Sequence, residues 1–281
     1  MSEKSISIGF SPCPNDTFIF DAMINNRIDT EGVSFNAVMA DVEELNTRAF
    51  SHELEVTKLS FHAFMHVVDR YILLRSGSAL GNNCGPILIS KKEYDKSDVE
   101  GLIIAIPGKY TTANYLLHHA FPNVEHVVEM LFSDIEGAIE SNKVDAGLII
   151  HENRFTYEAK GLSKIIDLGK HWHERTNTPI PLGGIAISRS VDLETQKKVN
   201  RILKRSVGYA MNNPEKSAEY VKAHAQELEE RVIQQHIALY VNNYTRDIGT
   251  RGEEAIELMF KDAAKRGIIK DAISKDFVLP G

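Results

Sequence analysis

Short apolar runs alternate with amphipathic stretches along the first two thirds of this 281-residue chain. Each run has the length of a buried strand, and most are followed by a polar turn. This rhythm is typical of βαβ units, which build a mostly parallel sheet with helices on its faces. In the first block it predicts strands at residues 5–10, 33–38, 55–59, 71–76 and 86–90, and helices at 17–25, 42–50 and 61–69.

The pattern is interrupted at residues 91–100, which are rich in charge, and then begins again. The second block predicts strands at residues 102–106, 126–130, 144–150 and 184–188, and helices at 112–120, 133–141 and from 192 onward. Two sheet-forming blocks indicate two α/β lobes. We expect a large domain of residues 1–90 and 184–281, a small domain of residues 91–183, and a ligand cleft between them.

Composition excludes several classes of partner. The net charge is -7, with 32 basic and 39 acidic residues and no long basic run, so no nucleic acid is expected. No apolar run approaches the ~20 residues that span a bilayer, so no membrane is expected. Cys13 and Cys84 are too far apart for a metal or redox motif and are expected to be reduced thiols. With no secretory signal at its start, the chain is predicted to be cytoplasmic.

Four polar turns follow predicted strands, at residues 11–17, 57–60, 108–113 and 151–154. The carboxyl ends of parallel strands lie at one edge of a sheet, where open α/β sheets bind their ligands. We therefore expect these turns to converge on a small-molecule substrate.

The turn at residues 108–113 leads into a predicted helix. Backbone N–H groups at a helix start are unpaired and bind carboxylates and phosphates. The hydroxyl of Thr111 or Thr112 could add a donor, and Gly108 lets the backbone approach a ligand closely. Thr111, Thr112 and Ala113 are therefore candidate binding residues, although threonine is also a common N-cap that binds nothing.

The turn around Lys58, Leu59 and Ser60 could likewise bind a ligand or have a purely structural role. Ser60 either caps the next helix or donates to a ligand, and Lys58 either supplies positive charge or is solvated. The turn at residues 11–17 is stiffened by two prolines. Asn15 or Asp16 is expected to cap a helix at residue 17, and this turn, Asn15 included, is a candidate wall of the pocket.

His151 comes directly after the apolar run at residues 144–150. Histidine is the side chain whose ordinary pKa lets it exchange a proton near neutral pH. Its place at the end of a strand makes it a candidate base, and a structural histidine remains the alternative. His171 and His173 lack a third ligand at metal-site spacing, and the chain has no P-loop or dinucleotide fingerprint. We expect no metal and no nucleotide cofactor.

Taken together, these segments resemble the 1,4-dihydroxy-6-naphthoate synthase family of the futalosine route to menaquinone. The likeness rests on residues 11–20 (SPCPNDTFIF), 57–60 (TKLS), 74–77 (LRSG), 108–113 (GKYTTA), 147–157 (GLIIHENRFTY) and 224–228 (HAQEL).

The resemblance implies a two-lobed, type II periplasmic-binding-protein-like fold used as a cytoplasmic lyase. The family converts cyclic dehypoxanthine futalosine to 1,4-dihydroxy-6-naphthoate and releases dihydroxyacetone without a cofactor. By the same resemblance the catalytic base falls on His151, and ligand-binding positions fall on Lys58 to Ser60 and on Thr112 and Ala113. Two alternatives stay open: a solute-binding module of the same fold without catalysis, and chorismate dehydratase, which shares the pathway and the fold. The sequence pattern does not indicate an oligomeric state.

Overall fold

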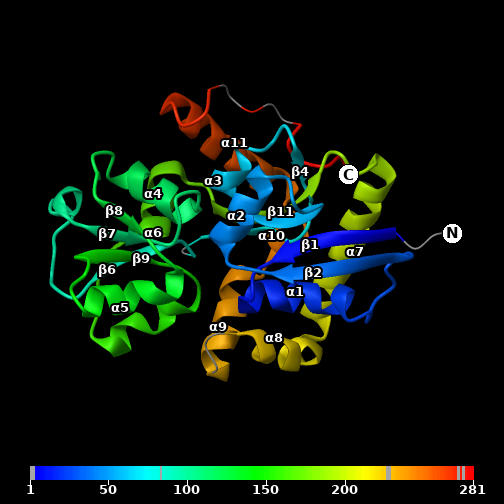
Figure 1. Cartoon of the computed structure of the whole chain (residues 1–281), viewed down its shortest axis with the longest axis horizontal. Coiled ribbons are helices and arrows are strands. Elements are labelled where there is room, and N and C mark those ends of the chain that lie inside the picture. Colours follow the sequence, from blue (N-terminus) through cyan, green and yellow to red (C-terminus); the bar gives the residue numbers. More distant parts are fainter. Residues whose placement is uncertain (1–3, 83, 226–228, 271–272, 274–275) are drawn as a thin grey trace.

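The computed structural model describes residues 4–82, 84–225, 229–270, 273 and 276–281, so residues 226–228 of the HAQEL segment lie outside it. Two α/β bodies, each built on its own sheet, lie side by side along the long axis of the molecule (Figure 1). The larger body contains both ends of the chain, and the smaller body is formed by the middle of the chain (green in Figure 1).

The first sheet has the order β2-β1-β3-β11-β4, with β5 also paired to β11. Strand β1 pairs in parallel with β2 and β3, whereas β11 runs antiparallel to β3, β4 and β5. Its strands are β1 (Lys4–Phe10), β2 (Val33–Met39), β3 (Val56–Ser60), β4 (Tyr71–Leu73), β5 (Ala79–Gly81) and β11 (Ile180–Ser188).

The second sheet has the order β10-β6-β9-β7-β8. Strand β7 is parallel to β8 and β9, and β6 is antiparallel to β9 and β10. Its strands are β6 (Ile87–Ser90), β7 (Ile104–Ile106), β8 (Val127–Glu129), β9 (Ala146–Ile149) and β10 (Ser163–Asp167).

Helices cover both sheets (Figure 1). Those of the larger body are α1 (Pro14–Ile24), α2 (Val42–Phe50), α3 (Phe61–Phe64), α7 (Leu193–Asn212), η5 (Pro214–Ser217), α8 (Ala218–His224), α9 (Glu230–Tyr240), α10 (Asn243–Arg246) and α11 (Gly249–Lys265). Those of the smaller body are η1 (Val99–Gly101), α4 (Thr112–Ala120), η2 (Phe132–Asp134), α5 (Ile135–Glu140), η3 (His151–Phe155), η4 (Tyr157–Lys160) and α6 (Leu168–Thr176). None of the described helices is long and apolar enough to cross a bilayer.

Two sequence expectations differ from these sheets. Both sheets are mixed rather than mostly parallel, because β11 returns antiparallel into the first sheet and β6 lies antiparallel in the second. The boundaries expected at residues 90 and 184 also differ from sheet membership: β6 already belongs to the second sheet, and β11 begins at Ile180 in the first. An apolar run shows that a strand is buried, but only its hydrogen-bonding partners decide which sheet it joins.

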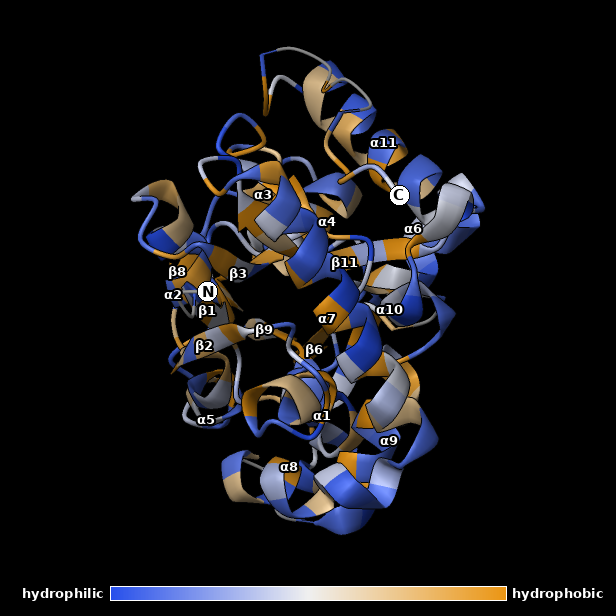
Figure 2. Ribbon diagram, turned by 90° about the vertical axis from the view of Figure 1, so that its right-hand side faces the viewer, coloured by the Kyte–Doolittle hydropathy of each residue, from blue (hydrophilic) through white to orange (hydrophobic). Residues whose placement is uncertain are grey.

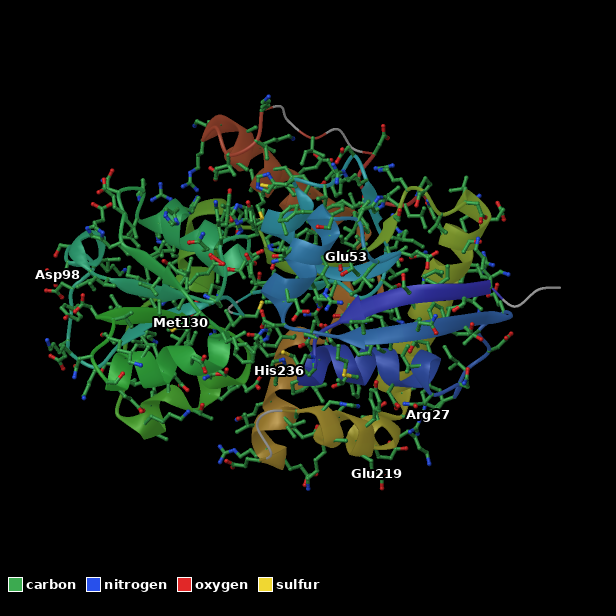
Figure 3. All side chains as sticks on the ribbon, viewed as in Figure 1. Arg27, Glu53, Asp98, Met130, Glu219 and His236 are labelled. Carbon is green, nitrogen blue, oxygen red and sulfur yellow. The ribbon has the colours of Figure 1, made fainter. Side chains whose placement is uncertain are left out.

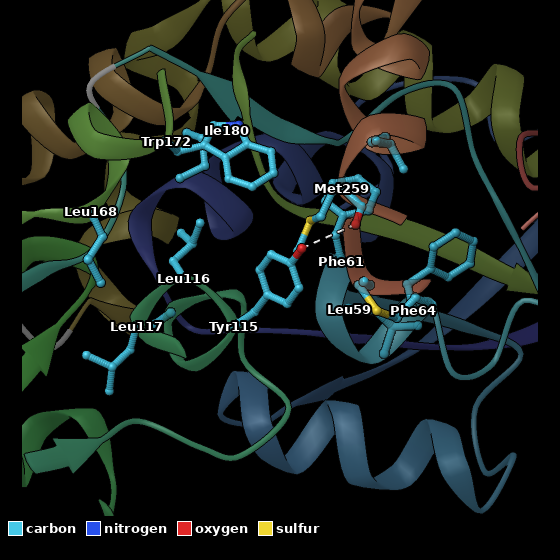
Figure 4. Close-up of a cluster of buried hydrophobic side chains, with 14 of the residues drawn as sticks. Leu59, Phe61, Phe64, Tyr115, Leu116, Leu117, Leu168, Trp172, Ile180 and Met259 are labelled. Atoms are coloured by element: carbon cyan, nitrogen blue, oxygen red, sulfur yellow. Dashed lines mark hydrogen bonds between the residues drawn. The ribbon is translucent and has the colours of Figure 1, made fainter. Parts of the chain in front are cut away.

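Hydrophobic residues lie along the strands and alternate with hydrophilic residues along the helices, as the ribbon colours of Figure 2 show. One buried cluster joins α4 and α6 to α3 and α11 (Figure 4). Within it the hydroxyl of Tyr115 donates to the Asp262 carboxylate at 2.5 Å and lies 3.3 Å from the carbonyl of Met259. Because this cluster draws on both bodies, it fixes how the two sheets face each other.

Candidate functional site

A cavity lies between the two bodies. Its volume is about 660 Å³ when the solvent-filled space at its open mouth is included. Its walls include side chains from the ends of β1, β3 and β9 and from the start of α4. All eight residues that the sequence proposed for the site line this cavity: Asn15, Lys58, Leu59, Ser60, Thr111, Thr112, Ala113 and His151.

His151 begins η3 immediately after β9, and its backbone adopts a left-handed conformation with φ of 57°. Non-glycine residues seldom adopt this conformation, which often marks a functional position. Its imidazole packs edge-on against Phe132, with 4.9 Å between ring centroids. Its Nε2 atom is buried and has no hydrogen-bond partner among the described residues, so a ligand in the cavity could engage it.

Burial lowers the pKa of His151 to about 4. The nearby charges have smaller effects: the Asp16 carboxylate raises this pKa, and the Lys58 ammonium lowers it. Burial disfavours the imidazolium because the charged form loses its hydration. At neutral pH the ring is therefore neutral and has a nitrogen lone pair that can accept a proton.

Lys58 and Asp16 form a buried ion pair at the cavity wall, with 2.6 Å between Nζ and Oδ1. Asp16 also accepts hydrogen bonds from the backbone and hydroxyl of Ser11 and from the amide of Asn15. The expected cap at residue 17 is wrong, because the helix begins at Pro14 and places Asn15 and Asp16 in its first turn. Proline at the first helical position favours this earlier start, since it has no N–H to leave unpaired.

The N-cap interpretation of Thr111 is confirmed. Its Oγ1 accepts from the backbone of Asn114 and donates to the carbonyl of Gly108. The hydroxyl of Thr112 donates to the carbonyl of Leu182 at 2.7 Å. Both hydroxyl protons are thus engaged within the protein, and what α4 can offer a ligand is the first-turn backbone N–H groups of Thr112 and Ala113.

Ser60 occupies the N-cap position of α3, but its side chain makes no capping hydrogen bond. Its hydroxyl instead lies 3.3 Å from the amide nitrogen of Asn46, whose carbonyl oxygen accepts from the backbone of Ser60. The hydroxyl oxygen accepts in that contact, so its own proton can be donated into the cavity.

Two hydrogen bonds link the larger body to the turn before α4. The carboxylate of Glu43 accepts from the backbone of Tyr110 at 2.8 Å, and Nδ1 of His62 lies 3.2 Å from the carbonyl of Thr111. They hold the start of α4 against the β3 end of the first sheet, which brings both binding segments to the wall of one cavity.

His236 is a feature of the site that the sequence analysis did not identify. It lies on α9, fully buried, where the two bodies meet (Figure 3). Its ring is nearly parallel to that of His151, with 6.0 Å between centroids, and its Nε2 lies 2.8 Å from Oδ1 of Asn15. One sequence feature could have indicated it: His236 lies on the buried face of an amphipathic helix, four residues before the buried Tyr240.

Within the described part of the chain, no group of three or more histidine, cysteine, aspartate or glutamate side chains is placed to hold a metal ion. His171 and His173 lie on α6. The two cysteines are buried free thiols, and burial raises the pKa of both.

Comparison with known proteins identifies the family of the chain. A family model described as menaquinone biosynthesis matches residues 6–265. The chain is 42% identical over 265 residues to the 1,4-dihydroxy-6-naphthoate synthase of Thermus thermophilus, covering 94% of this chain and 96% of that protein. It is 40% identical over 275 residues to the enzyme of the same name from Streptomyces coelicolor, with 96% of each covered. The chain belongs to the 1,4-dihydroxy-6-naphthoate synthase family.

Solved structures agree with this fold. A protein of Archaeoglobus fulgidus, 35% identical to this naphthoate synthase family member, superposes with a TM-score of 0.89 over 94% of this chain and 98% of its own. The alkanesulfonate-binding protein of Xanthomonas axonopodis pv. citri superposes with a TM-score of 0.75 at 12% identity, over 99% and 98% of the two chains. The family therefore has the two-lobed architecture of periplasmic binding proteins.

Proposed function

We propose that this protein is a lyase of menaquinone biosynthesis that converts cyclic dehypoxanthine futalosine to 1,4-dihydroxy-6-naphthoate and dihydroxyacetone. Its membership of the naphthoate synthase family supports the reaction. The observation that carries the proposal is the position of His151, whose unpartnered Nε2 lies beside a cavity enclosed by both bodies.

The proposed chemistry starts with proton removal. His151, neutral near pH 7, takes a proton from the substrate, the ring of the sugar-derived part opens, and a retro-aldol-like cleavage breaks a carbon–carbon bond. Formation of the aromatic diol provides much of the driving force. The protein then contributes orientation of the substrate, a base in the correct protonation state and exclusion of water, and no cofactor is required by these steps.

Two parts of the cavity wall suit the polar groups of such a substrate. The first-turn N–H groups at Thr112 and Ala113 carry the partial positive charge of a helix start and would bind a carboxylate. Lys58, paired to Asp16, adds a buried cation on the β3 side, and Ser60 adds a hydroxyl donor. Because the net charge of -7 mildly repels anions, recognition of a carboxylate depends on these local groups.

The alternatives predict different outcomes for one incubation. Purified protein is mixed separately with cyclic dehypoxanthine futalosine and with chorismate, and naphthoate absorbance, dihydroxyacetone and chorismate consumption are followed. The proposal predicts naphthoate and dihydroxyacetone in equal amounts from the first compound only. Consumption of chorismate would identify the dehydratase, and a bound compound that persists unchanged would identify a solute-binding module. For the site of action we propose the cytoplasm, supported by two buried free thiols, which are typical of a reducing compartment.

A further inference from the structure

The buried imidazole of His236 lies behind the wall of the cavity rather than in it. The ring is fully buried, while its neighbours Asn15, His151 and Tyr240 all line the cavity. Its Nε2 lies 2.8 Å from Oδ1 of Asn15, and its Nδ1 lies 3.6 Å from Oε2 of Glu152. The residue therefore contacts the machinery proposed above without reaching a ligand itself.

The orientation of the Asn15 amide follows from its other neighbour. Asn15 Nδ2 donates to Asp16 Oδ1 at 2.8 Å, and an ionised carboxylate can only accept. The oxygen of the amide must therefore point to His236, and Nε2 of His236 must carry the proton that it donates. Burial lowers the pKa of His236 well below its usual value, so the ring is neutral and Nε2 bears its one proton.

This arrangement leaves Asn15 with a free donor. Its amide nitrogen has two protons, and one hydrogen bond from it is made among the described residues, to Asp16. The side chain lies at the cavity wall, so the second proton is available to a substrate oxygen. A hydrogen bond from His236 to the amide oxygen restrains rotation of that donor away from the ligand.

We infer that His236 is a positioning residue, which orients the Asn15 amide toward the substrate. The inference rests on the proposed function, because it assigns His236 a part in the same reaction.

Two substitutions of equal polarity separate this role from general packing. In His236→Gln the amide nitrogen reaches the place of Nε2 and can still donate to Asn15. In His236→Asn the shorter side chain places its amide near Nδ1 instead, toward Glu152. We expect His236→Gln to keep wild-type kcat/KM and His236→Asn to lose about tenfold, the usual effect of one neutral hydrogen bond. Unfolding midpoints are measured for both variants.

The variants His236→Gln and His236→Asn are then compared in a protein that also carries Asn15→Ala. If His236 acts through Asn15, the difference between glutamine and asparagine at position 236 disappears there. Equal kcat/KM for the two single variants, or a difference that survives in Asn15→Ala, would overturn the inference.

A third measurement requires neither substrate nor a folded variant. Nitrogen-15 NMR of the wild-type protein should show His236 as the neutral tautomer with its proton on Nε2, and a proton on Nδ1 alone would also overturn the inference. Because this readout needs no turnover, an inactive wild-type protein would reject the proposed function while leaving the tautomer of His236 measurable.

Discussion

The ammonium of Lys58 and the carboxylate of Asp16 meet at 2.6 Å in the wall of the cavity, where their side chains are 8% and 1% exposed. Charges so deeply buried are tolerated because each compensates the other and the carboxylate is further satisfied by Ser11 and Asn15. The pair therefore fixes the Lys58 ammonium at the cavity wall and is also required for stability.

Asp16→Asn should destabilise the protein by about 3–5 kcal/mol, because it leaves the buried ammonium of Lys58 without a counter-charge. Urea unfolding at pH 7 measures the change. The matched control is Glu174→Gln, which removes the exposed pair between Lys170 and Glu174 and should change stability by less than about 1 kcal/mol. Equal changes in the free energy of unfolding would contradict this prediction, because the buried pair would then stabilise the protein no more than the exposed pair.

Gly108→Ala should raise KM for the substrate. Gly108 has a φ of 145°, and an added Cβ would lie 2.5 Å from the Cγ and Cδ atoms of Glu43. The Glu43 carboxylate would have to move and release the backbone of Tyr110, which would displace the start of α4. The control is Gly208→Ala in α7, where an added Cβ meets nothing within 4 Å. That variant should bind substrate normally and be more stable by about 0.5–1 kcal/mol.

Stability should fall as the pH is lowered from about 6.5 to about 4. Burial lowers the pKa of His62 to about 4, so in this window the unfolded chain binds a proton that the folded protein excludes. The loss from this residue is roughly 3 kcal/mol across the window. Urea unfolding at several pH values tests it against His62→Asn, whose amide can keep the hydrogen bond to the carbonyl of Thr111 but does not titrate. An unchanged pH dependence in that variant would contradict this assignment.

Local sequence signals predicted some elements with the correct bounds. The helices at residues 42–50 and 112–120 begin and end as expected, because Asp41 and Thr111 accept hydrogen bonds from the first turn of each helix. The cavity-lining turns at residues 11–17, 108–113 and 151–154 could also be predicted, since each follows a strand end, whereas residues 57–60 belong to strand β3 itself. Strands β5 and β10 were missed because one has three residues and the other is largely polar.

The unpredicted parts of the site depend on contacts between distant segments. His236 meets Asn15 across 221 residues of chain, and nothing in the local pattern of α9 indicates that partner. Lys58 was a candidate site residue, but its burial could not be predicted because it depends on Asp16, 42 residues away. A sequence pattern reports the faces of single elements, whereas the packing of one body against the other decides which polar groups become buried together.

The turnover of His151→Asn tests most directly whether His151 is the general base. Asparagine adopts left-handed backbone conformations more readily than most residues, so this variant should fold and keep the wild-type unfolding midpoint. His126→Ala, at an exposed histidine outside the cavity, is the control and should retain full activity. We expect naphthoate formation by His151→Asn to fall by about 10²–10⁴-fold, the usual contribution of a general base. A folded His151→Asn protein that forms naphthoate at the wild-type rate would contradict this expectation.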